Sequence, residues 1–239
     1  MMLKKKYILK FLFEFIAIFM GISASFWLNQ ISIKNEDEKQ RQRVLINLST
    51  EVNEIRKYCN QSLKLWNQDI EIYSALLQDD LNINLLKNIT RSKSRIEYNL
   101  IYYRDFLPPM NRYNSMISSG DLKYLKSEKL KEILTRLHSI NLSRIKTTVK
   151  DEQLLKEQMI SLLTIDHSQL FVKAVNNKFK LEDYSKTLHL SIRNDLKLKS
   201  NMLVQMKYFK YRISSLKLYI SSLEELNEEI ELLISNSKN

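Results

Sequence analysis

The side chains from which a catalytic or metal site would be built are few and widely spaced. His138, His167 and His189 lie far apart, and none has the partner spacing of a helical zinc-binding pair. Cys59 is the only cysteine, which excludes an intramolecular disulfide, and it has no nearby histidine with which to bind zinc. We expect the histidines at the surface or its boundary, and Cys59 buried on a helix face.

Sites that depend on glycine or on paired carboxylates are also missing. The two glycines, Gly21 and Gly120, are too far apart to form a phosphate-binding loop. Acidic residues alternate with basic ones at the spacing of an ordinary helix surface, so no pair of carboxylates suited to acid–base catalysis stands out. We therefore predict a chain that is not an enzyme, with no catalytic residue, no cofactor and no metal.

The composition indicates how such a chain folds. Its 239 residues are enough for one folded unit and an anchor, and 44% of them are hydrophobic, which is too many for a disordered chain. It has only two glycines and two prolines, whereas sheet proteins use many of both in turns and bulges. The sequence therefore predicts an all-α fold: a transmembrane helix that continues into a bundle of long helices with coiled-coil-like packing.

The net charge of +11 raises the question of an anionic partner. Basic residues are interspersed with acidic ones along almost every segment, and no dense basic helix stands out. The C-terminal region is acidic, with Glu224, Glu225, Glu228, Glu229 and Glu231 close together. The distribution disfavours nucleic acid as a partner and leaves binding of an anionic membrane as an interpretation that depends on charge alone.

The N-terminal region has the pattern of a membrane anchor. Residues 1–10 form a basic tail, and Phe11 to Leu28 are 18 mainly apolar positions followed by Asn29 and Gln30. At about 1.5 Å per residue this run is roughly 27 Å long, close to the thickness of the hydrocarbon core. We therefore predict a transmembrane helix over residues 11–30, with the lipid bilayer as its partner.

Within this span, one acidic residue and three small residues could serve contacts. Glu14 lies one helical turn after Lys10, so it either forms an interfacial ion pair with that lysine or contacts a partner helix. Gly21, Ala24 and Ser25 share one helix face, where small side chains let a second helix approach closely. Glu14, Gly21, Ala24 and Ser25 are thus the candidate helix–helix contact in the membrane.

The predicted span could instead be a signal peptide, and the sequence says little about which way the span crosses the membrane. Ser23-Ala24-Ser25 also resembles the cleavage site of a signal peptide, although the apolar run continues beyond it. Four basic residues precede the span and four follow it, so the distribution of positive charge is nearly even. A short basic tail before a span is typical of a signal anchor, which predicts an extramembrane domain outside the cytoplasm.

Residues 31–239 form the predicted helical extramembrane domain. Apolar or small residues recur three and four apart from Leu45 to Leu77, which predicts a stalk helix over residues 31–78. Residues 79–120 are rich in Asn and contain Pro108-Pro109, so we expect irregular short helices and loops there. Tyrosines in this part either pack or bind a ligand. After a turn at Gly120, residues 121–239 are predicted to form long helices.

The last predicted helix has a regular apolar stripe interrupted by an amide, Asn227. In an intermolecular coiled coil, such a residue sets register and oligomeric state. The stripe is therefore a candidate self-association seam of a homo-oligomer, or it is the core of the chain's own bundle. Its members are Ile213, Leu216, Ile220, Leu223, Asn227 and Ile230.

Two stretches resemble an uncharacterised family, a domain of unknown function found in small membrane-anchored helical proteins of Gram-negative bacteria. They are EFIAIFMGISASFWLNQ (Glu14–Gln30) and RYNSMISSGDLKYLKSEKLKEIL (Arg112–Leu134). The matching positions are Glu14, Gly21, Ile22 and Asn29 of the span and the turn Ser118–Leu122. The chain departs from the usual Asn-Asn-Trp ending, since Trp27 comes earlier and Gln30 replaces the second Asn. The family has no established activity, so the resemblance implies topology, with a single pass through the inner membrane and a periplasmic domain.

These observations lead to one expected function and one alternative. We expect a membrane-tethered helical module for protein–protein interaction or scaffolding, without catalytic activity and with an unidentified protein partner. The alternative is a sensor-type bundle that binds a small ligand and signals through the helix connected to the membrane.

Overall fold

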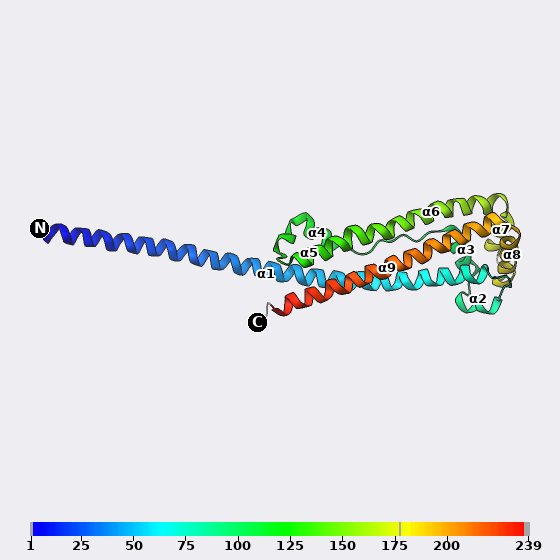
Figure 1. Ribbon diagram of the computed structural model, residues 1–239, viewed down its shortest axis with the longest axis horizontal. Coiled ribbons are helices and arrows are strands. Elements are labelled where there is room, and N and C mark those ends of the chain that lie inside the picture. The colour runs from blue at the N-terminus through cyan, green and yellow to red at the C-terminus, as the bar shows by residue number, and fades with distance from the viewer. Residues whose placement is uncertain (1, 177, 237–239) are drawn as a thin grey trace.

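The computed structural model describes residues 2–176 and 178–236, with side chains from Phe13 onward, and every regular element among them is helical. This confirms the all-α fold class. A long N-terminal helix leaves a bundle that the rest of the chain forms (Figure 1). The elements in chain order are α1 (Met2–Leu76), α2 (Ile83–Ile89), α3 (Lys93–Ile101), α4 (Asn111–Ser119), the 3₁₀-helix η1 (Asp121–Tyr124), α5 (Glu128–Thr135), the π-helix η2 (Arg136–Asn141), α6 (Leu142–Ile165), α7 (Ser168–Val175), α8 (Leu181–Asn194) and α9 (Leu196–Asn236).

Helix α1 joins the predicted span to the bundle without a break. It is 75 residues long, and no glycine or proline interrupts it after Gly21. Its side chains from Phe13 to Asp37 are exposed, and burial begins with Val44 and Leu45. Most of the predicted stalk over residues 31–78 is therefore a core helix of the bundle, and only its first turns are free of the other helices.

Three long rods make up the bundle. Helix α9 returns alongside α1 in the opposite direction, and α6 packs against α9 (Figure 1). Helices α5, η2 and α6 follow one another directly, so residues 128–165 form one rod with a π-helical turn. Helices α2, α3, α7 and α8 cover the far end of the bundle, and α4, η1 and α5 lie at the end nearer to the exposed part of α1.

The turn predicted at Gly120 is present and ends α4. Gly120 has φ 74° and ψ 15°, a left-handed conformation that glycine adopts without steric cost. The helix start comes later than the turn: η1 intervenes, and the Ser127 hydroxyl caps α5 by accepting a hydrogen bond from the Leu130 amide.

The buried apolar side chains form two clusters along the bundle. The proximal core lies nearer to the exposed part of α1, and the distal core lies at the far end. The proximal core contains Leu45, Leu48, Val52, Ile55, Cys59, Trp66, Phe106, Leu130, Ile145, Val149, Leu216, Leu223 and Ile230, among others. The distal core contains Ile72, Tyr73, Leu76, Ile96, Leu100, Met159, Leu163, Leu188, Met202 and Phe209, among others.

Candidate functional site

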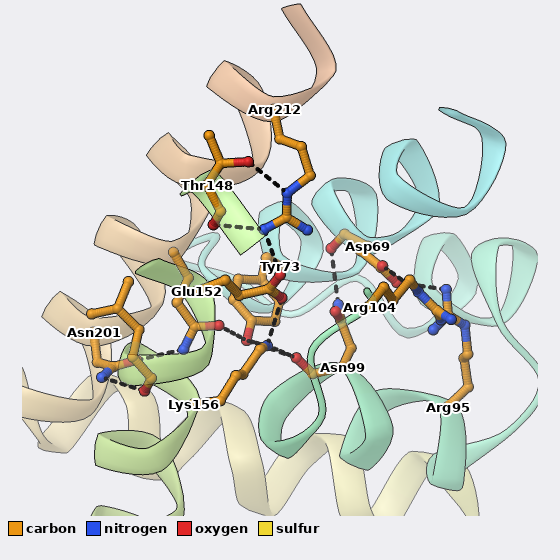
Figure 2. A network of polar contacts seen from close by, with 12 residues as sticks. Asp69, Tyr73, Arg95, Asn99, Arg104, Thr148, Glu152, Lys156, Asn201 and Arg212 are labelled. Carbon is orange, nitrogen blue, oxygen red and sulfur yellow. Dashed lines mark hydrogen bonds and ion pairs between the residues drawn. The ribbon is translucent and has the colours of Figure 1, made fainter. Parts of the chain in front are cut away.

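A layer of buried polar side chains lies at the junction of the two cores, and four segments of the chain contribute to it. Asp69 follows Trp66 of the proximal core on α1 and precedes Ile72 of the distal core. On α6, Glu152 and Lys156 lie between the two cores in the same way. Figure 2 shows these residues facing one another across the bundle. We call this set the polar layer: Asp69 and Tyr73 of α1, Asn99 of α3, Thr148, Glu152 and Lys156 of α6, and Asn201, Gln205 and Arg212 of α9.

The centre of the polar layer is a carboxylate between two cations. Nη2 of Arg212 lies 2.5 Å from Oε2 of Glu152, and Nζ of Lys156 lies 3.7 Å from its Oε1. All three side chains are at most 4% exposed. Arg212 also donates to the hydroxyl and the carbonyl of Thr148, each at 3.2 Å. These contacts fix α9 against α6 at one register.

A second set of hydrogen bonds connects α6 to α1 and α3. The Lys156 ammonium donates to the Tyr73 hydroxyl at 3.1 Å and to the Asn99 carbonyl. The Tyr73 hydroxyl lies 2.8 Å from Oε1 of Gln205 and 2.9 Å from the Asn99 carbonyl, so its single proton serves one of these two acceptors. The Gln205 amide donates in turn to Oδ1 of Asn201.

Towards the surface, the polar layer continues through Asp69. Its two carboxylate oxygens accept from Nη2 of Arg95 at 2.5 Å and from Nε of Arg104 at 3.0 Å. The Asp69 carbonyl accepts from the Asn99 side-chain amide at 3.0 Å. The extended chain around Arg104 is thereby held against α1, although it belongs to no helix.

Burial dominates the electrostatics of the polar layer. Loss of solvation lowers the pKa of Lys156 to about 8, although the Glu152 and Asp69 carboxylates oppose this shift. Burial likewise raises the pKa of the Tyr73 phenol well above its ordinary value. Rings add favourable contacts, because the Arg212 guanidinium lies 5.0 Å from the centre of the Trp66 ring.

We expect replacement of Lys156 by methionine to change how stability depends on pH. A lysine whose pKa is lower in the folded than in the unfolded state costs stability at neutral pH, and this cost is relieved as pH rises through about 8 towards 10.5. Between pH 8 and 10 the unfolding free energy of the wild type should therefore rise relative to that of Lys156→Met. Urea unfolding followed by circular dichroism measures the difference, and parallel curves for the two proteins would contradict the assignment.

Two surface grooves between α6 and α9 reach the polar layer. The first has a volume of about 530 Å³ and is lined by Arg144, Thr148, Asp151, Tyr208 and Tyr211, among others. The second has a volume of about 450 Å³ and includes the side chain of Asn201. Thr148 of the first groove accepts a hydrogen bond from Arg212, and Asn201 of the second accepts one from Gln205. Each groove therefore has a lining residue that bonds directly to a buried side chain of the polar layer.

The structure separates the histidines and places each in a structural contact. His167 pairs with Asp195, with Nε2 and Oδ2 2.9 Å apart. His138 stacks on Tyr113, and burial lowers its pKa to about 4. His189 is buried, with Nδ1 3.0 Å from the Leu76 carbonyl, so its expected place at the surface or its boundary was wrong.

The buried position expected for Cys59 is confirmed, because Cys59 is fully buried in the proximal core. Burial raises the pKa of its thiol to about 12.

The candidate self-association seam lies inside the chain's own bundle. Ile213, Leu216, Leu223 and Ile230 are buried in the proximal core, and Ile220 packs against it. The packing of α9 against α1 and α6 covers this stripe, which leaves its buried members unavailable to a second copy in this fold. Asn227 lies at the margin of the stripe and donates to Oε1 of Glu231 at 2.6 Å.

The candidate membrane contact occupies the exposed part of α1. Glu14, Gly21, Ala24 and Ser25 are all exposed, and a Cβ added at Gly21 would meet nothing within 4 Å. The Ser25 hydroxyl donates to the Gly21 carbonyl of the same helix. The predicted pairing of Glu14 with Lys10 involves a side chain outside those that the structure describes.

The tyrosines of residues 98–113 do not converge on one point. Tyr98 and Tyr102 stack on each other with ring centres 5.0 Å apart, whereas Tyr113 stacks on His138. Phe106, from the same stretch, is buried in the proximal core against Trp66.

The polar layer was not predicted from the sequence, although the sequence contains a signal for it. On α6 the buried face runs through Ile145, Val149, Glu152, Lys156, Met159 and Leu163 at intervals of three and four. Two charged residues therefore occupy positions at which this spacing predicts apolar ones. A charge at such a position must find a buried partner, and this is the signal that could have identified Glu152 and Lys156.

Comparisons of the chain with protein-family models, curated proteins and solved structures find no match. The resemblance to the uncharacterised membrane-anchored family stays a prediction.

Proposed function

We propose that this protein is a membrane-tethered helical module for protein–protein interaction or scaffolding, without catalytic activity. The observation that carries the proposal is the continuity of α1. One helix contains the apolar stretch after Phe13 and, 30 to 60 residues later, the side chains around which α6 and α9 pack. A bundle connected in this way follows the position and tilt of its anchor.

The exposed part of α1 supports membrane anchoring. It is the one helix among the described residues that is long and apolar enough to cross a membrane, with an 18-residue window of mean hydropathy 1.5 that is not buried at all. Large side chains such as Phe15, Phe19 and Trp27 are each more than 60% exposed. Soluble proteins rarely expose so large an apolar surface, whereas a bilayer covers it.

The finer topology is part of the proposal. A short basic tail before the span supports a single pass through the inner membrane with the bundle in the periplasm. The face with Glu14, Gly21, Ala24 and Ser25 supports association between spans, in homo-oligomers or with another membrane protein. Coiled-coil-like packing of the long helices belongs to the same proposal.

We expect the full chain to sediment with membranes and to stay there through carbonate extraction. The reason is that Phe13 to Leu28 exposes apolar side chains on every face of α1. Immunoblotting of the pellet and the supernatant measures the distribution. A soluble form shortened by about 25 residues would instead establish cleavage after Ser25 and remove the anchor.

The sensor-type bundle is the second candidate, and the polar layer favours it. A ligand in the groove beside Thr148 would lie next to the Arg212–Glu152 ion pair, which fixes the register of α6 and α9. A shift of that register would pass along α1 towards the membrane. A metabolite screen by thermal shift separates the candidates: a compound that stabilises the wild type but not Tyr211→Ala would support the sensor.

A further inference from the structure

The end of the bundle farthest from the span exposes an unusual amount of apolar surface. Among the described residues after Ile33, only five large apolar side chains are more than 60% exposed. Four of them lie at this end, which we call the distal tip: Ile165 (75%), Val172 (63%), Val175 (76%) and Leu196 (76%). They are as exposed as the side chains of the span itself, such as Phe13 (69%).

Specific contacts hold the distal tip together. The His167–Asp195 pair joins the corner between α6 and α7 to the start of α9, which brings Ile165 and Leu196 to the same end of the molecule. Figure 1 shows α7 and α8 at this end, opposite to the N-terminus. On α7, Leu170 and Ala174 face the core, so Val172 and Val175 lie on the outward face.

The α7 helix is also fixed at its C-terminal end. The Lys93 ammonium of α3 donates to the carbonyls of Lys173 and Asn176, at 3.0 and 2.5 Å. Lys173 in turn donates to the hydroxyl of Thr187 on α8 at 2.8 Å. The apolar side chains of the distal tip are therefore presented by an anchored helix.

Positive charge surrounds these apolar side chains. Lys178, Lys180 and Lys197 are exposed. Two acidic residues nearby are already engaged, because Asp195 pairs with His167 and Glu182 pairs with Lys87 and Lys186. Asp166 and Asp183 are exposed acidic residues of this end, and Asp79 and Asp80 after α1 are exposed there as well. The exposed Arg91 and Arg193 equal the second pair in number, so cations still outnumber the remaining anions. Such a surface complements an anionic partner and repels a second copy of itself.

The residue types favour a lipid over a protein as that partner. Protein interfaces rely on tryptophan, tyrosine and arginine, whereas the exposed apolar residues of the distal tip are Ile, Val and Leu. Apolar side chains gain from burial at the boundary between headgroups and acyl chains, and neighbouring lysines are attracted to anionic lipids.

We propose that the distal tip docks onto an anionic lipid bilayer, with its aliphatic side chains in the headgroup region and its lysines at the phosphates. From Ile33 to Leu76, α1 continues for 43 residues, or about 65 Å. This distance holds the distal tip away from the bilayer of its own span. This step depends on the proposed anchor: if the span lies in one bilayer, the bilayer onto which the distal tip docks is a second one. The protein then connects two membranes.

The test uses the full chain in phosphatidylcholine nanodiscs, mixed with vesicles of phosphatidylcholine that contain or lack phosphatidylglycerol. We expect flotation of the discs with the phosphatidylglycerol vesicles only. Lys178→Gln/Lys197→Gln should weaken this binding about 30-fold, since each lysine near an anionic surface contributes about fivefold. Val172→Asp/Val175→Asp should abolish it.

The matched controls place the same kinds of substitution, two lysines to glutamine or two aliphatic residues to aspartate, on the side of the bundle. Lys207→Gln/Lys210→Gln and Leu154→Asp/Leu218→Asp alter exposed residues far from the distal tip and should bind like the wild type. Equal binding by wild-type and distal-tip variants, or no binding of the wild type to phosphatidylglycerol vesicles, would overturn the proposal. Failure of the chain to enter nanodiscs would refute the proposed anchor instead. In that case, flotation of the free chain with the same vesicles would still show whether the distal tip binds phosphatidylglycerol.

Discussion

Replacement of Glu152 by alanine is expected to lower the free energy of unfolding by about 3–5 kcal/mol. Glu152 is the carboxylate between Lys156 and Arg212, and all three side chains are buried. Without it, two cations stay in the interior with no anion in direct contact, and neither can reach water without opening the bundle. Urea unfolding of the full chain in detergent, followed by circular dichroism, measures the loss.

Two further variants test this explanation. Glu157→Ala removes an exposed carboxylate from the same helix and should change stability by less than about 0.5 kcal/mol. The triple variant Glu152→Met/Lys156→Met/Arg212→Met removes all three charges, and it should recover most of the stability because no buried charge is left unpaired. A Glu152→Ala protein as stable as the wild type would show that the polar layer is not a closed ion-pair network.

Replacement of Leu216 by alanine is expected to lower the free energy of unfolding by about 2–5 kcal/mol. Leu216 is fully buried in the proximal core, where α9 packs along α1. The substitution removes apolar contacts and leaves a cavity. Because the stripe around Leu216 is covered by the same chain, the drop in unfolding midpoint caused by Leu216→Ala should be the same at every protein concentration. Thermal unfolding at several concentrations measures both quantities.

The comparison for Leu216 is Leu218, two residues further along α9. Leu218 is 54% exposed, so Leu218→Ala should be nearly neutral. If the drop caused by Leu216→Ala changed with concentration while that of Leu218→Ala did not, the seam from Ile213 to Ile230 would be shared between copies, contrary to its burial within one chain.

Periodicity made the helices predictable. Apolar residues at intervals of three and four align on one face of a helix, and the lack of glycine and proline leaves few places where α1 or α9 could end. The apolar stretch of α1 was predictable for the same reason, since its length and composition do not depend on the rest of the fold.

Periodicity marks Glu152 and Lys156 as charged residues at apolar positions of α6, but it does not identify their partners, because the polar layer is built from four segments. The spacing of Glu152 and Lys156 suits an exposed helical pair as well as a buried one. Only the packing of α6 against α9 and α3 places them beside Arg212 and Tyr73 in the interior. Similarly, the apolar stripe through Leu216 and Leu223 could pack against a helix of a second copy or in the chain's own core. The structure shows that it packs in the chain's own core.

The local sequence thus determined which segments are helical, which face of each is apolar, and which segment is long and apolar enough to cross a membrane. Only the tertiary structure shows which helix faces pack together. That packing assembles the polar layer, buries the seam and leaves the distal tip exposed. The physical reason is that helix formation depends on hydrogen bonds and side chains within a few residues, whereas burial of a charge or exposure of an apolar residue such as Val175 depends on helices distant in the chain.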